Sequence, residues 1–388
     1  MKAKKILILD KTLTKHGGSG NSMSKIAKSL VSLGYDLSYI TLFTHSTEHD
    51  IGNIKRYYLK KSSSKNEKNI FERYIHYIFF VVPELNRIIK NEKINLIITS
   101  QSEANFVGKV IKLFNKKIKF WMIIRCADSD EFFISKLIKK LDFLADKIIP
   151  VSKTIAEDEI KMFPHKDIIS IYNPFDLNEI NEKKDEKLTD PFEEKLFKEN
   201  NIIINVGGLR YIKNQLLLIK AFEKLKEKRK NIKLVIIGEG SLRKQLEEYI
   251  QKNNLENDVY LLGFRENPFK YVSKADVFVL SSKFEGFGRV LIEAMECGTP
   301  IVSANCNAGP SELLDDKLLS ETIIEDYKIC KWGILVNKDN IVAFSDAIDL
   351  VLDNKKLSTN LIKNGYRRAK DFKVENIVKK WEEVLNEI

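Results

Sequence analysis

The chain has 388 residues, of which 44% are hydrophobic and 31% are charged, and it contains four cysteines. This length exceeds what one hydrophobic core usually fills, so we expect two domains, and the composition excludes a disordered or fibrous chain. Four cysteines without a CxxC pair exclude a disulfide framework and argue against zinc. No apolar run reaches the roughly 18 residues of a membrane span, and the first residues lack a signal-peptide pattern, which predicts a soluble protein of a reducing compartment.

The net charge of +11 is unevenly distributed along the chain. Residues 1–180 hold 30 basic and 20 acidic side chains, whereas residues 181–388 hold 35 and 34. A basic half is typical of proteins that bind nucleic acid or an anionic membrane. A lysine-rich composition is the alternative explanation, although composition alone would not confine the excess to one half.

Apolar runs that alternate with helical patterns predict a doubly wound α/β fold in the first half of the chain. A polar stretch at 60–69 is expected to be a mobile loop. The predicted helices are 23–31, 106–114 and 137–144, and the predicted strands are 5–9, 37–42, 94–99, 119–124 and 147–151.

A second α/β series follows a charged stretch at 181–190, which we interpret as a linker. The amphipathic segment 374–388 is expected to form a final helix that packs back toward the first domain. The predicted domains are therefore 1–176, 177–373 and this helix. In the second series we predict strands at 202–206, 233–237, 259–262, 277–280 and 300–303, and helices at 215–227, 243–252, 288–297 and 342–353.

Three glycine-containing loops lie between a predicted strand and a predicted helix. The first contains Gly17 to Gly20, whose backbone amides could approach an anion, although a flexible turn explains it equally. The second runs from Val206 through Arg210 and Lys213, and it offers two cations beside a helix start. The alternative explanation is that Arg210 and Lys213 are ordinary basic residues of the surface. The third, at Gly238 to Ser241, needs only a structural explanation.

The segment 281–310, SSKFEGFGRVLIEAMECGTPIVSANCNAGP, carries the clearest functional signal. Glu285 and Glu293 stand on either side of seven residues, and Gly286, Phe287 and Gly288 open the predicted helix. Free amides at that point can bind hydroxyl or phosphate oxygens, and a carboxylate can accept hydrogen bonds from sugar hydroxyls. Glu293 would lie one to two turns inside the helix, where it could hold ribose hydroxyls.

This segment resembles the glutamate-x7-glutamate signature of retaining, family 4 type glycosyltransferases of the two-domain GT-B fold, including those of bacterial surface-polysaccharide assembly. Further similar segments run along most of the chain. They are GGSGNS, ADKIIPVSKTIAED, IYNPFD, VGGLRYIKNQ, VIIGEGSLRKQLE and VYLLGF. The resemblance implies two Rossmann-like domains that face a central cleft, with the acceptor bound by the first and the nucleotide sugar by the second.

The resemblance also implies roles for single residues. Glu285 would contact the donor sugar, Glu293 the ribose, and Lys213 the diphosphate that Gly18 also approaches. Glu285 and Lys213 would be the catalytic pair. The amides of Gly286, Phe287 and Gly288 would surround the sugar and phosphate.

Two positions depart from the family pattern. Gly208 stands where the family usually has arginine, and Arg210 is the candidate replacement. Where many members have a histidine after the strand at 119–124, this chain has Arg125 to Asp128. Arg125 and Asp128 are therefore alternative acceptor contacts. Asp128 and Asp130 form a DxD pattern, but it lies in the expected acceptor domain, so we expect that no metal is required.

The mechanism implied is same-face attack, in which the departing diphosphate takes the acceptor proton. We expect a UDP-sugar as donor, since the GPSE loop at 309–312 is similar to transferases of that kind. A lipid-linked saccharide is the expected acceptor, and contact with an anionic membrane is expected in place of nucleic acid. The expected location is the cytoplasm or the inner face of its membrane. The alternatives are a GT-B-like UDP-sugar epimerase and a non-enzymatic protein that binds nucleotide sugar or nucleic acid.

Overall fold

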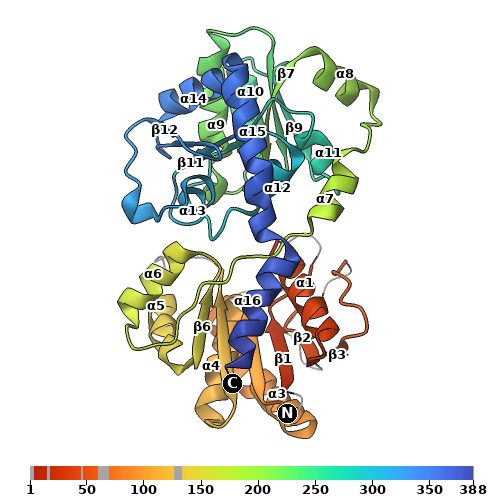
Figure 1. Ribbon diagram of the computed structural model, residues 1–388, viewed down its shortest axis with the longest axis vertical. Coiled ribbons are helices and arrows are strands. Elements are labelled where there is room, and N and C mark those ends of the chain that lie inside the picture. The colour runs from red at the N-terminus through yellow and green to blue at the C-terminus, as the bar shows by residue number, and fades with distance from the viewer. Residues whose placement is uncertain (1–3, 15–17, 45–46, 60–69, 126–132, 388) are drawn as a thin grey trace. The chain divides into compact units, whose positions relative to one another are not determined.

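The computed structural model describes residues 4–14, 18–44, 47–59, 70–125 and 133–387. The predicted loop at 60–69 lies outside these residues. The chain forms two compact units. Unit 1 comprises Met1–Phe175 and Val374–Ile388, and unit 2 comprises Asp176–Lys373. In each unit, helices pack against one mainly parallel sheet, which is a Rossmann-like arrangement (Figure 1).

The unit 1 sheet has the order β3-β2-β1-β4-β5-β6, and each adjacent pair is parallel. Its central strands are short apolar runs because helices cover both of their faces. The predicted strands are all present, with ends that differ by one or two residues. The strands are β1 (Lys5–Asp10), β2 (Asp36–Thr41), β3 (Lys55–Tyr57), β4 (Leu96–Ser100), β5 (Lys119–Ile124) and β6 (Lys147–Pro150).

The final helix of the chain belongs to unit 1, where it packs against α1 (Figure 1). Lys147 on β6 also reaches this segment, with its Nζ 2.9 Å from a Glu387 carboxylate oxygen. The helices of unit 1 are α1 (Gly18–Ser32), α2 (Ile70–His76), the π-helical turn η1 (Tyr77–Val81), α3 (Val82–Glu92), α4 (Ser102–Phe114), α5 (Phe133–Lys140), η2 (Leu141–Leu144), α6 (Lys153–Met162) and α16 (Val374–Asn386).

The unit 2 sheet has the order β12-β13-β11-β10-β7-β8-β9. All adjacent pairs are parallel except β12 and β13, an antiparallel edge that the sequence pattern did not predict. The core on one face includes Ile203, Phe222 and Phe344, each fully buried. The strands are β7 (Asn201–Val206), β8 (Ile232–Ile237), β9 (Val259–Gly263), β10 (Val277–Leu280), β11 (Ile301–Ala304), β12 (Tyr327–Ile329) and β13 (Ile334–Val336).

The helices of unit 2 are α7 (Leu177–Lys184), α8 (Pro191–Glu199), the 3-10 turn η3 (Tyr211–Lys213), α9 (Gln215–Lys226), α10 (Arg243–Lys252), α11 (Phe269–Val272), α12 (Arg289–Cys297), α13 (Pro310–Asp315), η4 (Leu319–Glu321), α14 (Ile341–Asp353), α15 (Lys355–Ala369) and η5 (Lys370–Phe372).

The linker predicted at 181–190 is wrong, because this stretch lies inside unit 2 and its first residues belong to α7. The Asp176 side chain caps α7 by accepting from the Glu179 amide (3.1 Å). Leu177 and Ile180 are buried, and α7 packs against α11 and α12. The charged residues that suggested a linker are divided between the end of this short helix and the segment that joins it to α8.

Candidate functional site

Two loops that follow neighbouring strands of unit 2 carry most of the predicted donor-binding residues. β7 leads through two glycines to η3, which ends at Lys213, and β10 leads to Glu285. Because β7 and β10 are adjacent and parallel, both loops leave the same edge of the sheet. The Lys283 amide donates to the Ile212 carbonyl (2.8 Å), and this bond joins the two loops. Ligands of doubly wound sheets bind at such a carboxyl edge.

Lys213 and Glu285 form an ion pair at this edge. The Lys213 Nζ lies 2.6 Å from the Glu285 Oε1, and the Ser282 hydroxyl donates to the same oxygen (2.7 Å). The Ser281 hydroxyl donates to the Lys213 carbonyl (2.9 Å). Since the Lys213 and Glu285 side chains are only 25% and 10% exposed, the contact is oriented and partly shielded from water. It brings together the two residues predicted to be catalytic.

The two glycine-containing loops of unit 2 lie against each other. A Cβ atom at Gly238 would stand 2.1 Å from the Gly207 carbonyl oxygen, and one at Gly240 would stand 2.3 Å from the Leu209 carbonyl oxygen. The Leu209 amide also donates to the Glu239 carbonyl (3.0 Å). The glycines of this turn therefore let it support the loop that carries Lys213.

Arg210 lies close to the position where the family pattern has arginine. A Cβ atom at Gly208 would be 3.3 Å from the Arg210 Nε, so the guanidinium folds back over the glycine. The Arg210 side chain is otherwise exposed. Because residue 208 is glycine instead of arginine, the space beside it is open to the Arg210 guanidinium.

The start of α12 is shaped by backbone packing. Gly288 precedes the helix with a φ of 85°, a value that favours glycine, and Phe287 is buried with its ring centroid 5.6 Å from that of Phe372. A Cβ atom at Gly309 would lie 1.9 Å from the Phe287 carbonyl oxygen. The Phe287 side chain is therefore an anchor in the core, which fixes the backbone at the helix start.

Glu293 lies on α12, one turn beyond Arg289. Its Oε1 is 3.6 Å from an Arg289 guanidinium nitrogen, and its side chain is 21% exposed. Burial lowers the pKa of Arg289, and Glu293 and then Glu179 oppose that effect. The Glu293 carboxylate thus stands beside a largely buried cation.

Cys306, which the sequence did not single out as functional, follows β11 beside the Lys213–Glu285 pair. It is fully buried, and burial raises the pKa of its thiol, with Glu285 adding to the increase and Lys213 opposing it. The thiol is therefore protonated at neutral pH and a poor nucleophile. A single cysteine after a predicted strand forms no sequence pattern that would mark Cys306 as part of the site.

Two side chains with buried polar atoms at the start of α9, Asn214 and Gln215, were also missed. Gln215 donates from its Nε2 to the Gly208 carbonyl (3.1 Å), which holds the loop that carries Lys213. Its Oε1 and the Asn214 Nδ2 are buried without a hydrogen-bond partner among the described residues. Buried polar atoms of this kind favour a site that receives a polar ligand.

The predicted residues of unit 1 are only partly described. Gly18 is exposed and begins α1, whereas Gly20 is buried against the backbone of Leu13, with a potential Cβ contact of 3.1 Å. Asp128 lies outside the described residues. Arg125 follows β5, where its Nε donates to the Ser100 hydroxyl (2.6 Å) and its guanidinium also donates to the Asn173 side chain (2.8 Å).

A fully buried carboxylate, Asp10, lies at the same edge of the unit 1 sheet. It accepts hydrogen bonds from the Tyr39 hydroxyl (3.1 Å), the Gln101 amide group (2.6 Å) and the Lys11 backbone (2.8 Å). Burial raises the pKa of Asp10 to about 6, against the opposing charge of Arg125 and these hydrogen bonds. Gln101 has a φ of 74°, a strained value for a side chain other than glycine. The aspartate that ends the apolar run KILILD was the available signal for this network.

No group of three or more His, Cys, Asp or Glu side chains among the described residues is placed to hold a metal ion. No helix in the described part of the chain is long and apolar enough to cross a membrane.

Comparison with known proteins identifies the family. The family model "Glycosyl transferases group 1" matches residues 186–368, which include Lys213, Glu285 and Glu293. An uncharacterized glycosyltransferase of Methanocaldococcus jannaschii, MJ1059, is 33% identical over 326 residues, which cover 76% of this chain and 80% of that protein. The chain therefore belongs to the group 1 glycosyltransferases.

Two further comparisons concern substrates and fold. The N-acetylgalactosamine-N,N'-diacetylbacillosaminyl-diphospho-undecaprenol 4-alpha-N-acetylgalactosaminyltransferase of Campylobacter jejuni is 29% identical over 371 residues, which cover 92% of this chain and 93% of that enzyme. The crystal structure of Anabaena HepE in complex with UDP has a TM-score of 0.75 at 19% identity, with 99% of this chain and 100% of that chain covered. The same protein is also known in complex with UDP-glucose. The GT-B fold expected from the sequence is confirmed.

Proposed function

We propose that the protein is a retaining glycosyltransferase that moves a hexose or N-acetylhexosamine from a UDP-sugar to a saccharide acceptor. The Lys213–Glu285 ion pair is the observation that carries this proposal. It joins a cation suited to a diphosphate with a carboxylate suited to sugar hydroxyls, at the carboxyl edge where such sheets bind nucleotides.

The donor occupies the loops that follow β7 and β10. Lys213 and Arg210 neutralise the diphosphate, and Glu285 with the amides of residues 286–288 contacts the sugar. Glu293 accepts hydrogen bonds from the ribose. The unpartnered polar atoms of Asn214 and Gln215 support a polar ligand here, and the Anabaena complexes favour uridine diphosphate as its leaving group.

Transfer proceeds on one face of the sugar. The bond between the anomeric carbon and the diphosphate oxygen breaks, the acceptor hydroxyl oxygen bonds to the same carbon, and its proton passes to the departing diphosphate. Lys213 and Arg210 stabilise the negative charge that develops on that leaving group. The protonated Cys306 thiol is a poor nucleophile, which favours this route over one through a covalent intermediate at that residue.

The acceptor is a lipid-linked saccharide bound by unit 1, in the biosynthesis of a bacterial polysaccharide, lipopolysaccharide or glycan. Arg125, fixed by Ser100 and Asn173, is the described candidate for contact with it, and Asp128 is the other candidate. The Campylobacter relative, named for a diphospho-undecaprenol-linked acceptor, supports this choice. The enzyme requires no metal. It acts at the inner face of the cytoplasmic membrane.

A panel of UDP-, GDP- and ADP-sugars tests the proposal, with ligand-induced thermal stabilisation as the first measurement. UDP-sugars should raise the melting temperature, and sugar should pass to a lipid-linked acceptor with its anomeric configuration unchanged. Stabilisation by GDP- or ADP-sugars alone would contradict the assignment of a UDP-sugar as the donor. Conversion of a UDP-sugar without any acceptor would identify an epimerase instead.

A further inference from the structure

An exposed row of residues runs along α2, η1 and α3. The opposite side of this helical stretch is buried in the unit 1 core, where Tyr77, Val81, Leu85 and Ile89 pack. Two consecutive aromatic side chains of the π-helical segment η1 point outward. The exposed fraction is 66% for Phe79 and 44% for Phe80. π-Helical turns are rare and are frequently found at functional sites. The outward residues Ile75, Phe79, Phe80, Arg87 and Lys90, with Lys93 at the helix end, are called the α2–α3 stripe below.

The two halves of the α2–α3 stripe differ in chemistry. The first half is apolar, and the second half carries Arg87, Lys90 and Lys93. Within the described ranges, no ion pair joins these three cations to a carboxylate, and Glu92, next to Lys93, is paired with Lys55.

A second exposed apolar patch in unit 1 provides a contrast. It lies on α5, η2 and α6, and it includes Phe143, which is 51% exposed. Lys139 there contacts Asp142 and Glu159, whereas Lys140 is exposed and is joined to no carboxylate by an ion pair among the described residues. The α2–α3 stripe differs from this patch in its two adjacent exposed aromatic rings and its three cations that form no ion pair among the described residues.

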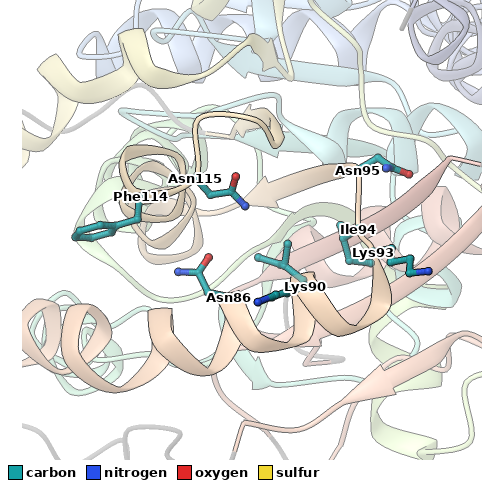
Figure 2. Close-up of a pocket in the computed structure, with 8 residues that line it drawn as sticks. Asn86, Lys90, Lys93, Ile94, Asn95, Phe114 and Asn115 are labelled. Carbon is teal, nitrogen blue, oxygen red and sulfur yellow. The ribbon is translucent and has the colours of Figure 1, made fainter.

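A hollow of about 460 Å³ extends the basic half of the stripe between the ends of α3 and α4 (Figure 2). Asn86, Lys90 and Lys93 line it from α3 and its C-terminal end, and Phe114 and Asn115 line it from the end of α4. Phe114 is 74% exposed. Ammonium and amide groups beside an exposed aromatic ring suit a phosphate headgroup whose acyl chains lie next to it.

We propose that the α2–α3 stripe, with Phe114, is a docking surface for an anionic lipid bilayer. Aromatic and aliphatic side chains that enter the interfacial region, together with basic residues attracted to anionic headgroups, are the features of helices that lie on membranes. A protein partner or a second copy would account for the apolar half, but the three cations favour a surface of high negative charge.

The start of the stripe lies near the carboxyl edge of the unit 1 sheet. Arg73 on α2 contacts Glu103 in the first turn of α4 (3.5 Å), and Lys11, which follows Asp10, contacts the same carboxylate (2.5 Å). A bilayer on the stripe would thus hold a lipid-linked saccharide beside the edge that carries Arg125. This last step rests on the proposed function, whereas bilayer docking itself does not.

Vesicle co-sedimentation of the whole chain tests the docking surface. The wild type should bind phosphatidylglycerol-containing vesicles more tightly than pure phosphatidylcholine vesicles, with affinity that falls as salt rises. Phe79→Ser with Phe80→Ser should weaken binding by about tenfold or more, because two exposed rings lose their insertion. Arg87→Gln with Lys90→Gln and Lys93→Gln should remove the preference for anionic vesicles. The matched control Phe143→Ser, with a ring of similar exposure elsewhere in unit 1, should bind like the wild type.

Unchanged vesicle binding by the Phe79 and Phe80 variant, or equal loss in Phe143→Ser, would overturn the proposal. So would a concentration-dependent dimer that the same double substitution abolishes, because it would assign the stripe to a second copy. UDP-sugar binding should stay unchanged in every stripe variant. Loss of vesicle binding with intact donor binding supports docking, and absent donor binding in the wild type would count only against the proposed function.

Discussion

Lys213 and Glu285 lie 72 residues apart in the sequence, yet their side chains meet at 2.6 Å. The contact exists because β7 and β10 are neighbours in the sheet, so that the loops after them share one edge. Ser282 holds the carboxylate, and the backbone of Lys213 is held by Ser281. An ammonium kept in place before the reaction stabilises developing charge without reorganisation, which is the basis of the proposed catalysis.

Arg210→Ala should slow transfer if the Arg210 guanidinium replaces the family arginine missing at 208. The loss should approach the effect of removing one preorganised electrostatic donor, roughly 10²–10³ in kcat. The double variant Gly208→Arg with Arg210→Ala should regain part of the rate, because removal of the Arg210 side chain frees the space beside position 208. Steady-state kinetics of the three proteins checks this. A silent Arg210→Ala would show that this arginine is only a surface residue.

Glu293→Gln should weaken the binding of UDP-sugar. The ribose hydroxyls would lose a charged acceptor, and hydrogen bonds to charged groups contribute about 1.5–3 kcal/mol, or roughly 10–150-fold in the dissociation constant. Glutamine keeps the shape of the side chain beside the buried Arg289. Isothermal titration calorimetry gives the constant directly. An unchanged constant in a folded variant would refute the ribose assignment.

Asp10→Asn should remove a pH-dependent part of the stability. The pKa of Asp10 is raised from 3.8 to about 6, so between these values the folded state binds more protons than the unfolded state. The contribution is complete below the lower value and is lost as the pH rises through the upper one. A shift of this size corresponds to at most about 3 kcal/mol.

Urea denaturation at several pH values from 4 to 7 measures this effect. The free energy of unfolding of the wild type, relative to Asp10→Asn, should fall across that range. The same series on Asp36→Asn, at the exposed start of β2, controls for the general loss of a carboxylate. If the difference in the free energy of unfolding between the wild type and Asp10→Asn stayed constant with pH, Asp10 would not titrate in this window.

The sequence predicted most of the strands and the loops that carry Lys213 and Glu285, for a physical reason. Apolar runs such as 277–280 must be buried, and the glycines and charged residues after them have few explanations other than a loop at the sheet edge. The linker prediction was wrong because α7 is short and polar. Its only helical features are the Asp176 cap and the two buried residues Leu177 and Ile180.

Other features depend on contacts between distant segments. The Asp10 network is formed by residues from four separate parts of unit 1, and the strained backbone of Gln101 is stabilised only by that packing. The position of Arg210 over Gly208 depends on the local turn, and the burial of Cys306 depends on the neighbouring strands. A pattern of single residues does not show these contacts between distant segments.

Lys213→Ala should lower kcat more than it raises the donor KM, because the diphosphate gains charge as the glycosidic bond breaks. The expected cost is about 2.7–4 kcal/mol of barrier, the scale of one preorganised electrostatic donor. Lys213→Arg should restore little, since a planar fork replaces a compact charge beside Glu285. Lys220→Ala on α9, whose ammonium stacks on Tyr249, is the matched control and should act like the wild type.

The most direct measurement compares the binding of UDP and of UDP-sugar to the wild type and to Lys213→Ala, and it needs no acceptor. UDP carries the charge that the leaving group acquires, whereas the intact donor does not. The substitution should weaken UDP binding by about tenfold more than UDP-sugar binding. Equal losses for the two ligands, or no loss for UDP in a folded variant, would contradict the diphosphate site at Lys213.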